Sequence, residues 1–567
     1  MQVKKRTINH DLKNKLVNSG VDKRLASILG ARDIQSFDDI SYDLKNLQSP
    51  HSLLDIDKAA NFLFECIIAQ KKILIIGDYD ADGATASACA VLGLRKFSAN
   101  VDFLVPNRFK FGYGLTPEIV EHALLKKPDV IITVDNGIAS IEGVKLAREN
   151  NIDVIVTDHH LPADDLPNAN FIINPNQPNC SFLSKNLCGV GVIFYFLLSL
   201  RVIFREKGKY TKKTEPKLHD LLDLVCLGTI ADLVILDYNN RILVEHGLKV
   251  IRNKNCNFGI QAIAKLSKKS LPSLKTSDLS FAIAPKLNAA GRLDDISIGI
   301  KCLLSSSYEE AESYAKELIS LNNKRREIES KMHTEAMKDI NLDHLSLPFS
   351  ICLYNKNWHQ GVIGILASRI KEKYPRPTVI FALDDSGLLK GSGRSISGLH
   401  LRDTLDLISK KNSNLIKSFG GHAMAAGLTI EETSFDLFVT IFEKTCSELL
   451  TEDDLNTVIN VDESILDNSV NFDIVKKIDM SIWGQGFIQP QYLDKFEVIE
   501  QSVLMDKHQK CKLNLNGYLY EGIFFNHTES LPDRIEAVYR VETNEFRENK
   551  KIQIINLKSG MCLNFVL

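Results

Sequence analysis

The sequence lacks the long apolar segments and the apolar leader that would mark a membrane or secreted protein. Its most apolar run, 190–204, contains Arg201 and is too short for a confident membrane span, so we expect a buried helix there. The first residues, MQVKKRTINHDLKNK, include no apolar stretch of the kind found in secretory signals. We therefore expect neither a signal sequence nor a membrane segment.

Paired cysteines are also absent. The 11 cysteines are scattered, their number is odd, and no CxxC pair occurs. This pattern argues against a disulfide framework and against a zinc ribbon. A reducing compartment fits it best, and we expect the protein to be cytoplasmic.

The sequence has no excess of charge of either sign. Its 69 lysines and arginines against 71 aspartates and glutamates give a formal net charge of −2. This balance argues against a uniformly basic nucleic-acid binder, although a local basic groove is not excluded. With 567 residues, 44% of them hydrophobic, the chain is long enough for three or four globular domains.

Short β-branched runs alternate with helix-like segments between residues 70 and 175. The runs are 73–76, 101–105, 129–134, 153–157 and 171–173, and the helix-like segments include 84–97 and 140–150. Continuous apolar strands separated by helices predict a parallel sheet that is covered on both faces. Ligands of such sheets bind beyond the carboxyl ends of the strands.

The rest of the chain predicts three further regions. Residues 308–340 contain no proline or glycine and predict a long helix that connects two lobes. A second α/β region follows from about 346 to 447, with strand candidates at 349–354 and 378–383. Beyond it, β-like segments predict a small barrel or sandwich; they are 496–504, 510–516, 518–526 and 535–541.

Acidic and imidazole groups follow three of the predicted parallel strands. The first strand runs into 77-GDYDADG-83, which places Asp78, Asp80 and Asp82 in one turn, and the later strands end in 135-DNG-137 and 158-DHH-160. Carboxylates this close repel one another unless a cation neutralises them. A single motif of this kind could be a solvated acidic turn, but three in succession indicate a shared site.

Asp232 is a further candidate, because it lies in the otherwise apolar segment 228–233. A buried aspartate there needs a partner, whereas a helix cap would be an unremarkable alternative. An oxygen-rich set with one or two imidazoles suits Mn²⁺ or Mg²⁺ better than zinc. Two such ions bridged by a carboxylate can promote in-line attack on phosphorus.

These motifs resemble the DHH phosphoesterase superfamily and, within it, the RecJ family, over nearly the whole chain. The matching segments are 77-GDYDADG-83, 106-PNRFKFGYGL-115, 133-TVDNGI-138, 157-TDHH-160, 228-GTIADLVIL-236, 285-PKLNAAGR-292, 358-WHQGVIGILASR-369, 391-GSGRSISGLHL-401 and 420-GGHAMAAGL-428. The resemblance implies a DHH catalytic domain with a parallel sheet, a long connector helix, a second α/β domain of the DHHA1 type and a C-terminal OB-fold barrel. It suggests the limits 1–45 for an N-terminal region, 46–265 for the DHH domain, 266–345 for the connector, 346–447 for the DHHA1-type domain and 448–567 for the OB-fold.

The resemblance also implies roles for individual residues at a site for two Mn²⁺ or Mg²⁺ ions. Asp80 and Asp135 would hold one ion, while Asp82, Asp135, His159 and Asp232 would hold the other, so that Asp135 bridges them. His160 would contact the scissile phosphate. Related phosphoesterases carry a histidine four residues before the first paired aspartate, where this chain has Ile76, and Asp78 would substitute for it directly or through water.

Substrate binding is implied for a second group of residues. They are Arg108, Arg292, Ser392, Arg394, Gly420, Gly421 and His422. Glycines permit close approach of a phosphate to the backbone, and arginine can grip its oxygens. A tight turn packed for steric reasons is the alternative for the glycine-rich segments, and Trp358 and His359 could either stack on a base or support the fold.

The barrel offers the stacking candidates Tyr518, Tyr520, Phe524 and Phe525. Strand alternation allows only about half of them to point outward, and packing in the core is the expected role of most. The basic stretch 201–217 could line a DNA path, although a solvated loop is the expected structure.

The function implied is that of an exonuclease that degrades single-stranded DNA from the 5′ end to 5′-mononucleotides in DNA repair and recombination. The expected partners are single-stranded DNA, a single-strand-binding protein and a helicase. One alternative is a phosphodiesterase of nano-RNA, cyclic dinucleotides or a nucleotide phosphate, which the additional C-terminal β region disfavours. A non-catalytic relative is the other alternative, and the complete set of acids and histidines argues against it.

Overall fold

The computed structural model describes residues 2–105, 114–340, 347–466, 471–546 and 549–556. The chain divides into two compact units, which are described separately below. The first comprises residues 5–319 and 460–567, and the second comprises residues 320–459 with the first four residues. The polypeptide therefore leaves the first unit through one long helix and returns to it for the C-terminal barrel.

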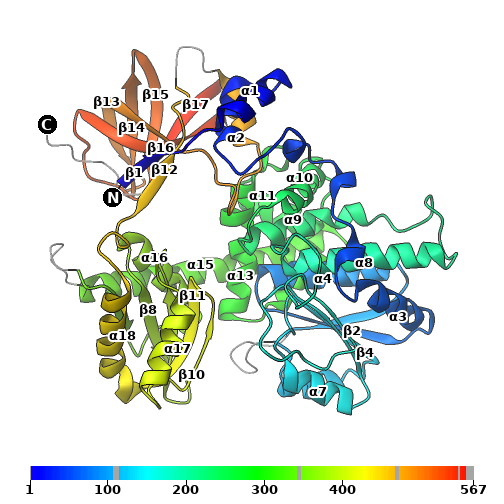
Figure 1. Ribbon diagram of the computed structural model, residues 1–567. Coiled ribbons are helices and arrows are strands. Elements are labelled where there is room, and N and C mark those ends of the chain that lie inside the picture. Colours follow the sequence, from blue (N-terminus) through cyan, green and yellow to red (C-terminus); the bar gives the residue numbers. More distant parts are fainter. Residues whose placement is uncertain (1, 106–113, 341–346, 467–470, 547–548, 557–567) are drawn as a thin grey trace. The chain divides into compact units, whose positions relative to one another are not determined.

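A five-stranded, fully parallel sheet organises the first unit (Figure 1). Its strands are β2 (Lys72–Gly77), β3 (Asn100–Leu104), β4 (Val130–Val134), β5 (Asp153–Thr157) and β6 (Phe171–Ile173), in the order β3-β2-β4-β5-β6. All five β4 residues are buried, as expected for the middle strand of a sheet covered on both faces. The predicted parallel sheet is confirmed, and β2, β4 and β5 are neighbours in it.

Helices cover both faces of this sheet. One face packs on α6 (Pro117–Leu124) and α7 (Ile141–Glu149), through an apolar cluster that includes Leu74, Ile119 and Val144. Further helices of this part are α3 (Ile56–Ile68), α4 (Ala81–Arg95), α8 (Gly189–Glu206), α9 (Leu222–Ala231), α10 (Tyr238–Arg252) and α11 (Phe258–Leu266). α4 packs on β2, α8 and α9, so it occupies the centre of this group.

The apolar run at 190–204 forms most of α8, and nearly all of its residues are buried against the protein. Among the described residues, the helices do not include one that is long and apolar enough to cross a membrane. The buried helix expected from the sequence is thus confirmed.

Residues 276–304 form a group of short helices that packs on α4. It comprises α12 (Thr276–Asp278), a π-helix, η6 (Leu279–Ile283), α13 (Ala284–Leu293) and α14 (Ser297–Leu304). α15 (Tyr308–Asp339) follows as the long helix predicted from the sequence, and it crosses the division between the two units.

The second unit contains a mixed sheet in the order β10-β11-β9-β8-β7. Its strands are β7 (Ile351–Tyr354), β8 (Thr378–Leu383), β9 (Leu388–Arg394), β10 (Ser418–Gly421) and β11 (Ala425–Glu431), and its helices are α16 (Ile363–Lys373), α17 (Leu401–Lys411) and α18 (Phe435–Leu449). An apolar core that includes Phe381, Leu405, Phe438 and Phe442 lies between this sheet and two of these helices. The predicted second α/β region is confirmed.

The C-terminal region forms a closed five-stranded barrel. Its strands are β13 (Tyr492–Leu504), β14 (His508–Leu515), β15 (Tyr518–Phe524), β16 (Arg534–Phe546) and β17 (Asn549–Asn556), in the order β13-β14-β15-β17-β16. The β15–β17 pair is parallel and the other pairs are antiparallel, which is the topology of an OB-fold. The sequence predicted a barrel or a sandwich, and the structure shows the barrel. The strand β17 was not predicted from the sequence.

Ion pairs to buried carboxylates join the barrel region to the N-terminal part of the first unit. Lys275, next to α12, lies 2.5 Å from Asp479 at the end of α19 (Phe472–Asp479), and Glu542 of β16 lies 3.6 Å from the same ammonium group. Arg32, just after α2 (Lys23–Gly30), makes two hydrogen bonds to the buried carboxylate of Asp462. Charge-assisted hydrogen bonds of this kind are stronger than bonds between neutral groups.

Candidate active site

The carboxyl ends of β2, β4 and β5 bring the acidic motifs together at one edge of the parallel sheet. Asp80 is the N-cap of α4, and its Oδ1 accepts a hydrogen bond of 2.9 Å from the Gly83 backbone N–H. An aspartate at this position satisfies an amide that the first helical turn leaves unpaired. The turn between β2 and α4 therefore fixes the Asp80 carboxylate at the edge of the sheet.

Asp82 is buried and faces the N-terminus of α8. Its carboxylate accepts hydrogen bonds from the backbone N–H groups of Gly189, at 2.6 Å, and Val190, at 3.0 Å. Burial, and next the charge of Asp80, still raise the pKa of Asp82 to about 7. The helix amides orient this carboxylate, but they do not compensate fully for its removal from water.

Asp135 lies at the centre of the site, buried and in a left-handed backbone conformation with φ of 62°. Gly189 packs directly against it, since a side chain at that position would collide with the Asp135 carboxylate. Burial, followed by the charges of Asp82 and Asp80, holds the pKa of Asp135 well above its ordinary value. Strained backbone of this kind concentrates at functional sites.

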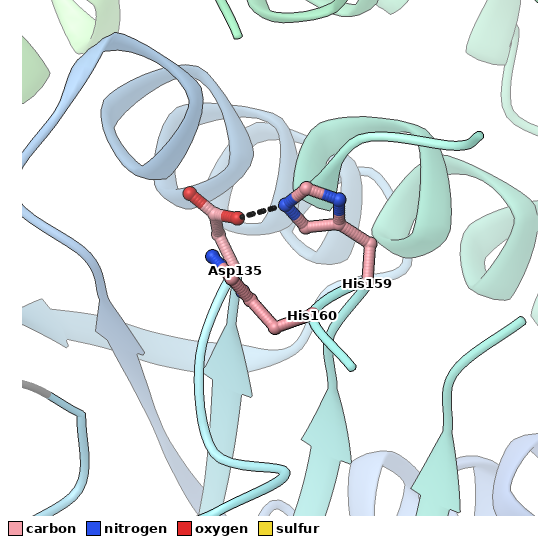
Figure 2. Close-up of side chains that lie close together, drawn as sticks. All are labelled: Asp135, His159 and His160. Carbon is pink, nitrogen blue, oxygen red and sulfur yellow. Dashed lines mark ion pairs between the residues drawn. The ribbon is translucent and has the colours of Figure 1, made fainter. Parts of the chain in front are cut away.

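His159 and Asp232 complete this side of the centre. The Nε2 atom of His159 points at Asp135, 3.1 Å from its Oδ1, as Figure 2 shows, and lies 3.6 Å from Oδ2 of Asp232. Asp232 is the C-cap of α9, so the helix-cap alternative describes its backbone position correctly. Its carboxylate nevertheless belongs to the acidic group, because burial and the charges of Asp82 and Asp80 raise its pKa well above the ordinary value.

The ligand atoms of the predicted metal-binding residues gather in overlapping sets. Asp78, Asp80 and Asp135 form one set, Asp82, His159 and Asp232 form another, and Asp135, His159 and His160 form a third; within each set the atoms lie within 4.8 Å of one another. Asp135 and His159 each belong to two sets, so the sets meet at these two residues.

The chemistry of this donor set fits Mn²⁺ or Mg²⁺. Carboxylate oxygens predominate and imidazole contributes a minority, as these cations prefer. Oδ1 of Asp135 is buried and accepts no hydrogen bond from the described residues, although His159 lies beside it. A divalent cation would neutralise acids whose mutual repulsion raises their pKa values.

Asp158, for which the sequence predicted no separate role, organises the DHH motif. Its buried carboxylate accepts hydrogen bonds from the backbone N–H of Ile138, at 2.9 Å, of His159, at 2.7 Å, and of His160, at 3.2 Å. Oδ1 also lies 2.8 Å from Nδ1 of His160. Burial alone would lower the pKa of the His160 imidazole, but this contact outweighs it and raises the pKa to about 9.

α13 supports the acidic turn from the other side. The backbone N–H of Ala81 donates to Oδ1 of Asn288, at 2.8 Å, and a side chain at Gly291 would collide with the carbonyl group of Tyr79. Arg292 follows in the last turn of α13, half-buried. The motif 285–292 therefore packs against the predicted metal site, a contact that strand periodicity could not reveal.

The second unit brings its own set of predicted residues together. Nη1 of Arg394 donates to Oγ of Ser392, at 3.3 Å, and to the carbonyl oxygen of Gly393, at 2.8 Å, and burial lowers the pKa of this arginine. A Cβ atom at Gly364, in the first turn of α16, would lie 2.8 Å from Ser392 Oγ and 3.0 Å from Arg394 Nη2. The guanidinium therefore lies against a helix N-terminus, where anions are favoured.

The glycine-rich segment 420–422 lies next to Arg394. β11 pairs Ala425 with Arg394, and the backbone N–H of His422 donates to the Ala425 carbonyl oxygen at 2.8 Å. Gly421 has a φ of +139°, and a side chain there would collide with Ala425 and Ala426, so the tight-turn explanation holds for this glycine. Gly420 and His422 are exposed at the end of β10, where they remain accessible.

The structure also shows which of the other candidate side chains are buried and which are exposed. Trp358 is buried and its Nε1 donates to Glu335, so it supports the fold and does not present a face for stacking. In the barrel, Tyr518 and Phe525 are exposed while Tyr520 and Phe524 are buried, so about half of the four candidates point outward, as expected. Arg108 lies outside the described residues.

The basic stretch 201–217 was expected to be a solvated loop, which is wrong for its beginning. Residues 201–206 continue α8, since the helix ends at Glu206. Arg201 and Arg205 both pair with Glu215, so part of the positive charge of this stretch is neutralised internally.

Comparison with known families and proteins identifies the domains. Residues 72–229 match the DHH family, N-terminal domain, residues 348–448 match the DHHA1 domain, and residues 461–557 match the RecJ OB domain. The single-stranded-DNA-specific exonuclease RecJ of Haemophilus influenzae is 46% identical over 93% of this chain and 94% of its own. The Escherichia coli protein of the same name is 42% identical over 94% of each.

Solved structures give the same result. RecJ of Thermus thermophilus in complex with Mn²⁺ superposes with a TM-score of 0.81 at 25% identity, covering 98% of this chain and 78% of that one. A structure of exonuclease RecJ bound to manganese is 32% identical, with a TM-score of 0.59, and covers 70% of this chain and 96% of its own. The identity and its extent along both chains leave one conclusion: this chain belongs to the RecJ family.

Proposed function

We propose that the protein is a metal-dependent exonuclease specific for single-stranded DNA. The observation that carries this proposal is the shared position of Asp135 between two sets of metal-ligating atoms at the sheet edge. It is supported by RecJ relatives that are 42–46% identical and are named single-stranded-DNA-specific exonucleases.

We assign the metal ligands as the family resemblance implies. Asp80 and Asp135 would hold one cation, while Asp82, Asp135, His159 and Asp232 would hold the second, and Asp78 would assist directly or through water. When bound, Mn²⁺ or Mg²⁺ ions lower the pKa of water and neutralise charge on a phosphate. The protein itself contributes the fixed orientation of these ligands, which the α4 cap and the α8 amides provide.

His160 would contact the scissile phosphate as a cation. The contact between its Nδ1 and Oδ1 of Asp158 orients the ring for this role. An imidazolium held in this way offers a hydrogen bond to charge that develops on the phosphate oxygens.

Phosphate groups of the strand would be held by the second group of residues. Ser392, Arg394, Gly420, Gly421 and His422 supply a hydroxyl, a guanidinium and a glycine-rich turn in one region of the second unit, and Arg292 and Arg108 are the proposed contacts of the first. Attack from the 5′ end with release of 5′-mononucleotides follows the pattern that the family resemblance implies. The sequence shows no base-reading motif, so the selection of single strands would rest on shape and stacking.

The wider assignments are also proposals. Repair and recombination are the expected processes, and a single-strand-binding protein and a helicase are the expected partners. The cytoplasm is the expected location, which fits the ten cysteines of the described residues, all of them free. The proposed limits are 1–45, 46–265, 266–345, 346–447 and 448–567 for the five regions.

A digestion of long single-stranded DNA with Mn²⁺ tests the function directly. Strands labelled at the 5′ end or the 3′ end, and a matched duplex, are incubated with the protein and with the Asp80→Ala variant. Immediate release of 5′-labelled mononucleotide, with the duplex spared and the variant inactive, is the expected result. Intact long strands together with rapid cleavage of dinucleotides would instead indicate a short-oligonucleotide phosphodiesterase.

A further inference from the structure

Phe281 is the most exposed aromatic side chain of the described residues. Its relative exposure is 75%, whereas that of the next two, Phe37 and Tyr518, is 45%. An aromatic ring left in water forgoes the free energy that burial would supply. One such ring is unremarkable alone, but the backbone that carries it and its place in the unit are both unusual.

The ring is presented by η6, the π-helix at Leu279–Ile283. π-helical turns are rare and occur frequently at functional sites. Leu279 and Ile283 are fully buried and anchor this turn at both ends. The carbonyl oxygen of Ala282 accepts hydrogen bonds from Nζ of the buried Lys286 and from Oγ of Ser267, which compensates for the altered backbone bonding. The outward direction of Phe281 is therefore built into the fold.

The π-helix lies on the segment that joins the barrel to the acidic turn. Lys275, six residues before Phe281, pairs with Asp479 and with Glu542 of the barrel. Asn288, seven residues after it, accepts a hydrogen bond from Ala81 beside the predicted metal ligands. The exposed ring therefore lies on a chain segment that contacts the barrel region at one end and the acidic turn at the other.

A turn that contains lysines packs against the π-helix that carries the ring. The turn after α11 packs against η6, because Ser267 bonds to Ala282 and Nζ of Lys269 lies 2.6 Å from Asp278. Lys268, between these two contact residues, has a left-handed backbone with φ of 57° and is exposed. An aromatic face next to lysine is the combination that binds single strands without reading their sequence.

We propose that Phe281, flanked by Lys268, is a stacking platform for one base of the single strand between the cleavage site and the barrel. This inference rests on the proposed function, since it requires a single strand to occupy the acidic edge. The ring stacks on a base of any identity, while the lysine faces the neighbouring phosphate.

Abasic scanning tests the platform. The full chain, without added divalent metal, binds mixed-sequence oligonucleotides of about 20 nucleotides, each with one abasic position moved stepwise from the 5′ end. Affinity is measured by fluorescence anisotropy for the wild type and for Phe281→Ala, Phe281→Leu and Phe281→Trp. Phe37→Ala, which removes another exposed phenylalanine, is the matched control, and thermal unfolding verifies that each variant is folded.

The wild type should lose affinity at one abasic position, whereas Phe281→Ala should bind the intact strand about tenfold more weakly and show no further loss at that position. Phe281→Trp should restore the positional loss, and Phe281→Leu should not. Equal affinity of Phe281→Ala and the wild type, or an unchanged abasic profile, would overturn the inference. Its failure is separable from failure of the proposed function, because the latter would appear as a wild type that leaves long strands uncut in Mn²⁺.

Discussion

The edge of the parallel sheet and the mixed sheet of the second unit are electrostatic opposites. At the first, Asp82 and Asp135 are buried among other acids, and repulsion raises their pKa values. At the second, Arg394 is largely withdrawn from water and bonds to a hydroxyl and a carbonyl, both neutral. Within the described residues, acids outnumber imidazoles at the first region and Arg394 forms no ion pair at the second, so the first calls for cations and the second for an anion. Metal ions and the phosphates of a nucleic-acid strand have these charges.

Among the changes considered, the loss of Asp135 at the acidic edge of the parallel sheet should lower activity most. We expect Asp135→Ala to lower the turnover of single-stranded DNA by at least about a thousandfold, because both proposed cations lose a ligand. Strand binding should persist through the second unit and the barrel. Turnover and Mn²⁺ affinity by calorimetry are the measurements. Asp102→Asn, which alters an acid paired with Lys126 on the surface, is the control, and full activity of Asp135→Ala would remove the bridging role.

The orientation of His160 at the acidic edge can be changed without removing a proposed metal ligand. In Asp158→Asn, the side-chain amide cannot accept from His160 and from the backbone N–H groups together, so the imidazole should lose its fixed orientation. We expect kcat to fall about 10- to 100-fold with little change in KM or in Mn²⁺ affinity. A parallel loss of Mn²⁺ affinity would show that Asp158 supports the metal ligands instead.

The contribution of Arg394, in the mixed sheet of the second unit, to the binding of single-stranded DNA should depend on salt concentration. Arg394→Gln should weaken binding of single-stranded DNA about tenfold and reduce the slope of log affinity against log salt concentration by about 0.7, the value for one phosphate contact. Arg394→Lys should keep the slope but lose part of the affinity. Arg402→Gln, which alters an exposed arginine of α17, is the control. An unchanged slope in Arg394→Gln would exclude a direct phosphate contact.

The smallest effect concerns stability without metal. Because folding raises the pKa of Asp82 to about 7, its stabilising contribution is present in full below the ordinary pKa and is lost as the pH rises through about 7. Asp135 and Asp232 act in the same direction. The chelated protein should therefore unfold at a temperature on the order of 5 °C lower at pH 8 than at pH 5, and Mn²⁺ should restore most of this difference.

Calorimetry at both pH values, with Asp82→Asn as the comparison, measures this effect. The variant should show a shallower dependence on pH, since one of the repelling acids is gone. If the variant and the wild type had identical pH profiles, the raised pKa of Asp82 would not be a source of the pH dependence.

Most of the correct predictions from the sequence concern residues that follow the ends of strands. Periodicity located β2, β4 and β5, and their parallel pairing then required Asp80, Asp135 and His159 to meet. What was missed depends on backbone groups and on tertiary packing. The amides of α8 that hold Asp82, the three N–H groups at Asp158 and the contact of Asn288 with Ala81 have no local sequence signal.

The second unit was less predictable for a related reason. The motifs around Ser392 and His422 identified the region, but the register of β9 and β11 determines that the 420–422 turn lies beside Arg394. Such a register depends on long-range pairing, which short motifs do not encode.

The ion pair of Lys275 with the buried Asp479 attaches the barrel region directly to the segment that leads to the acidic turn, unlike a domain on a flexible tether. A tether would let affinity increase gradually as strands lengthen, because its effective concentration varies smoothly with reach. Direct attachment instead gives a threshold length. Strands too short to reach the barrel gain no affinity from it, and strands just long enough gain nearly all of the affinity that it provides. Progressive shortening of a strand from its 5′ end should therefore end in one abrupt release, at a remnant length that the fold itself sets.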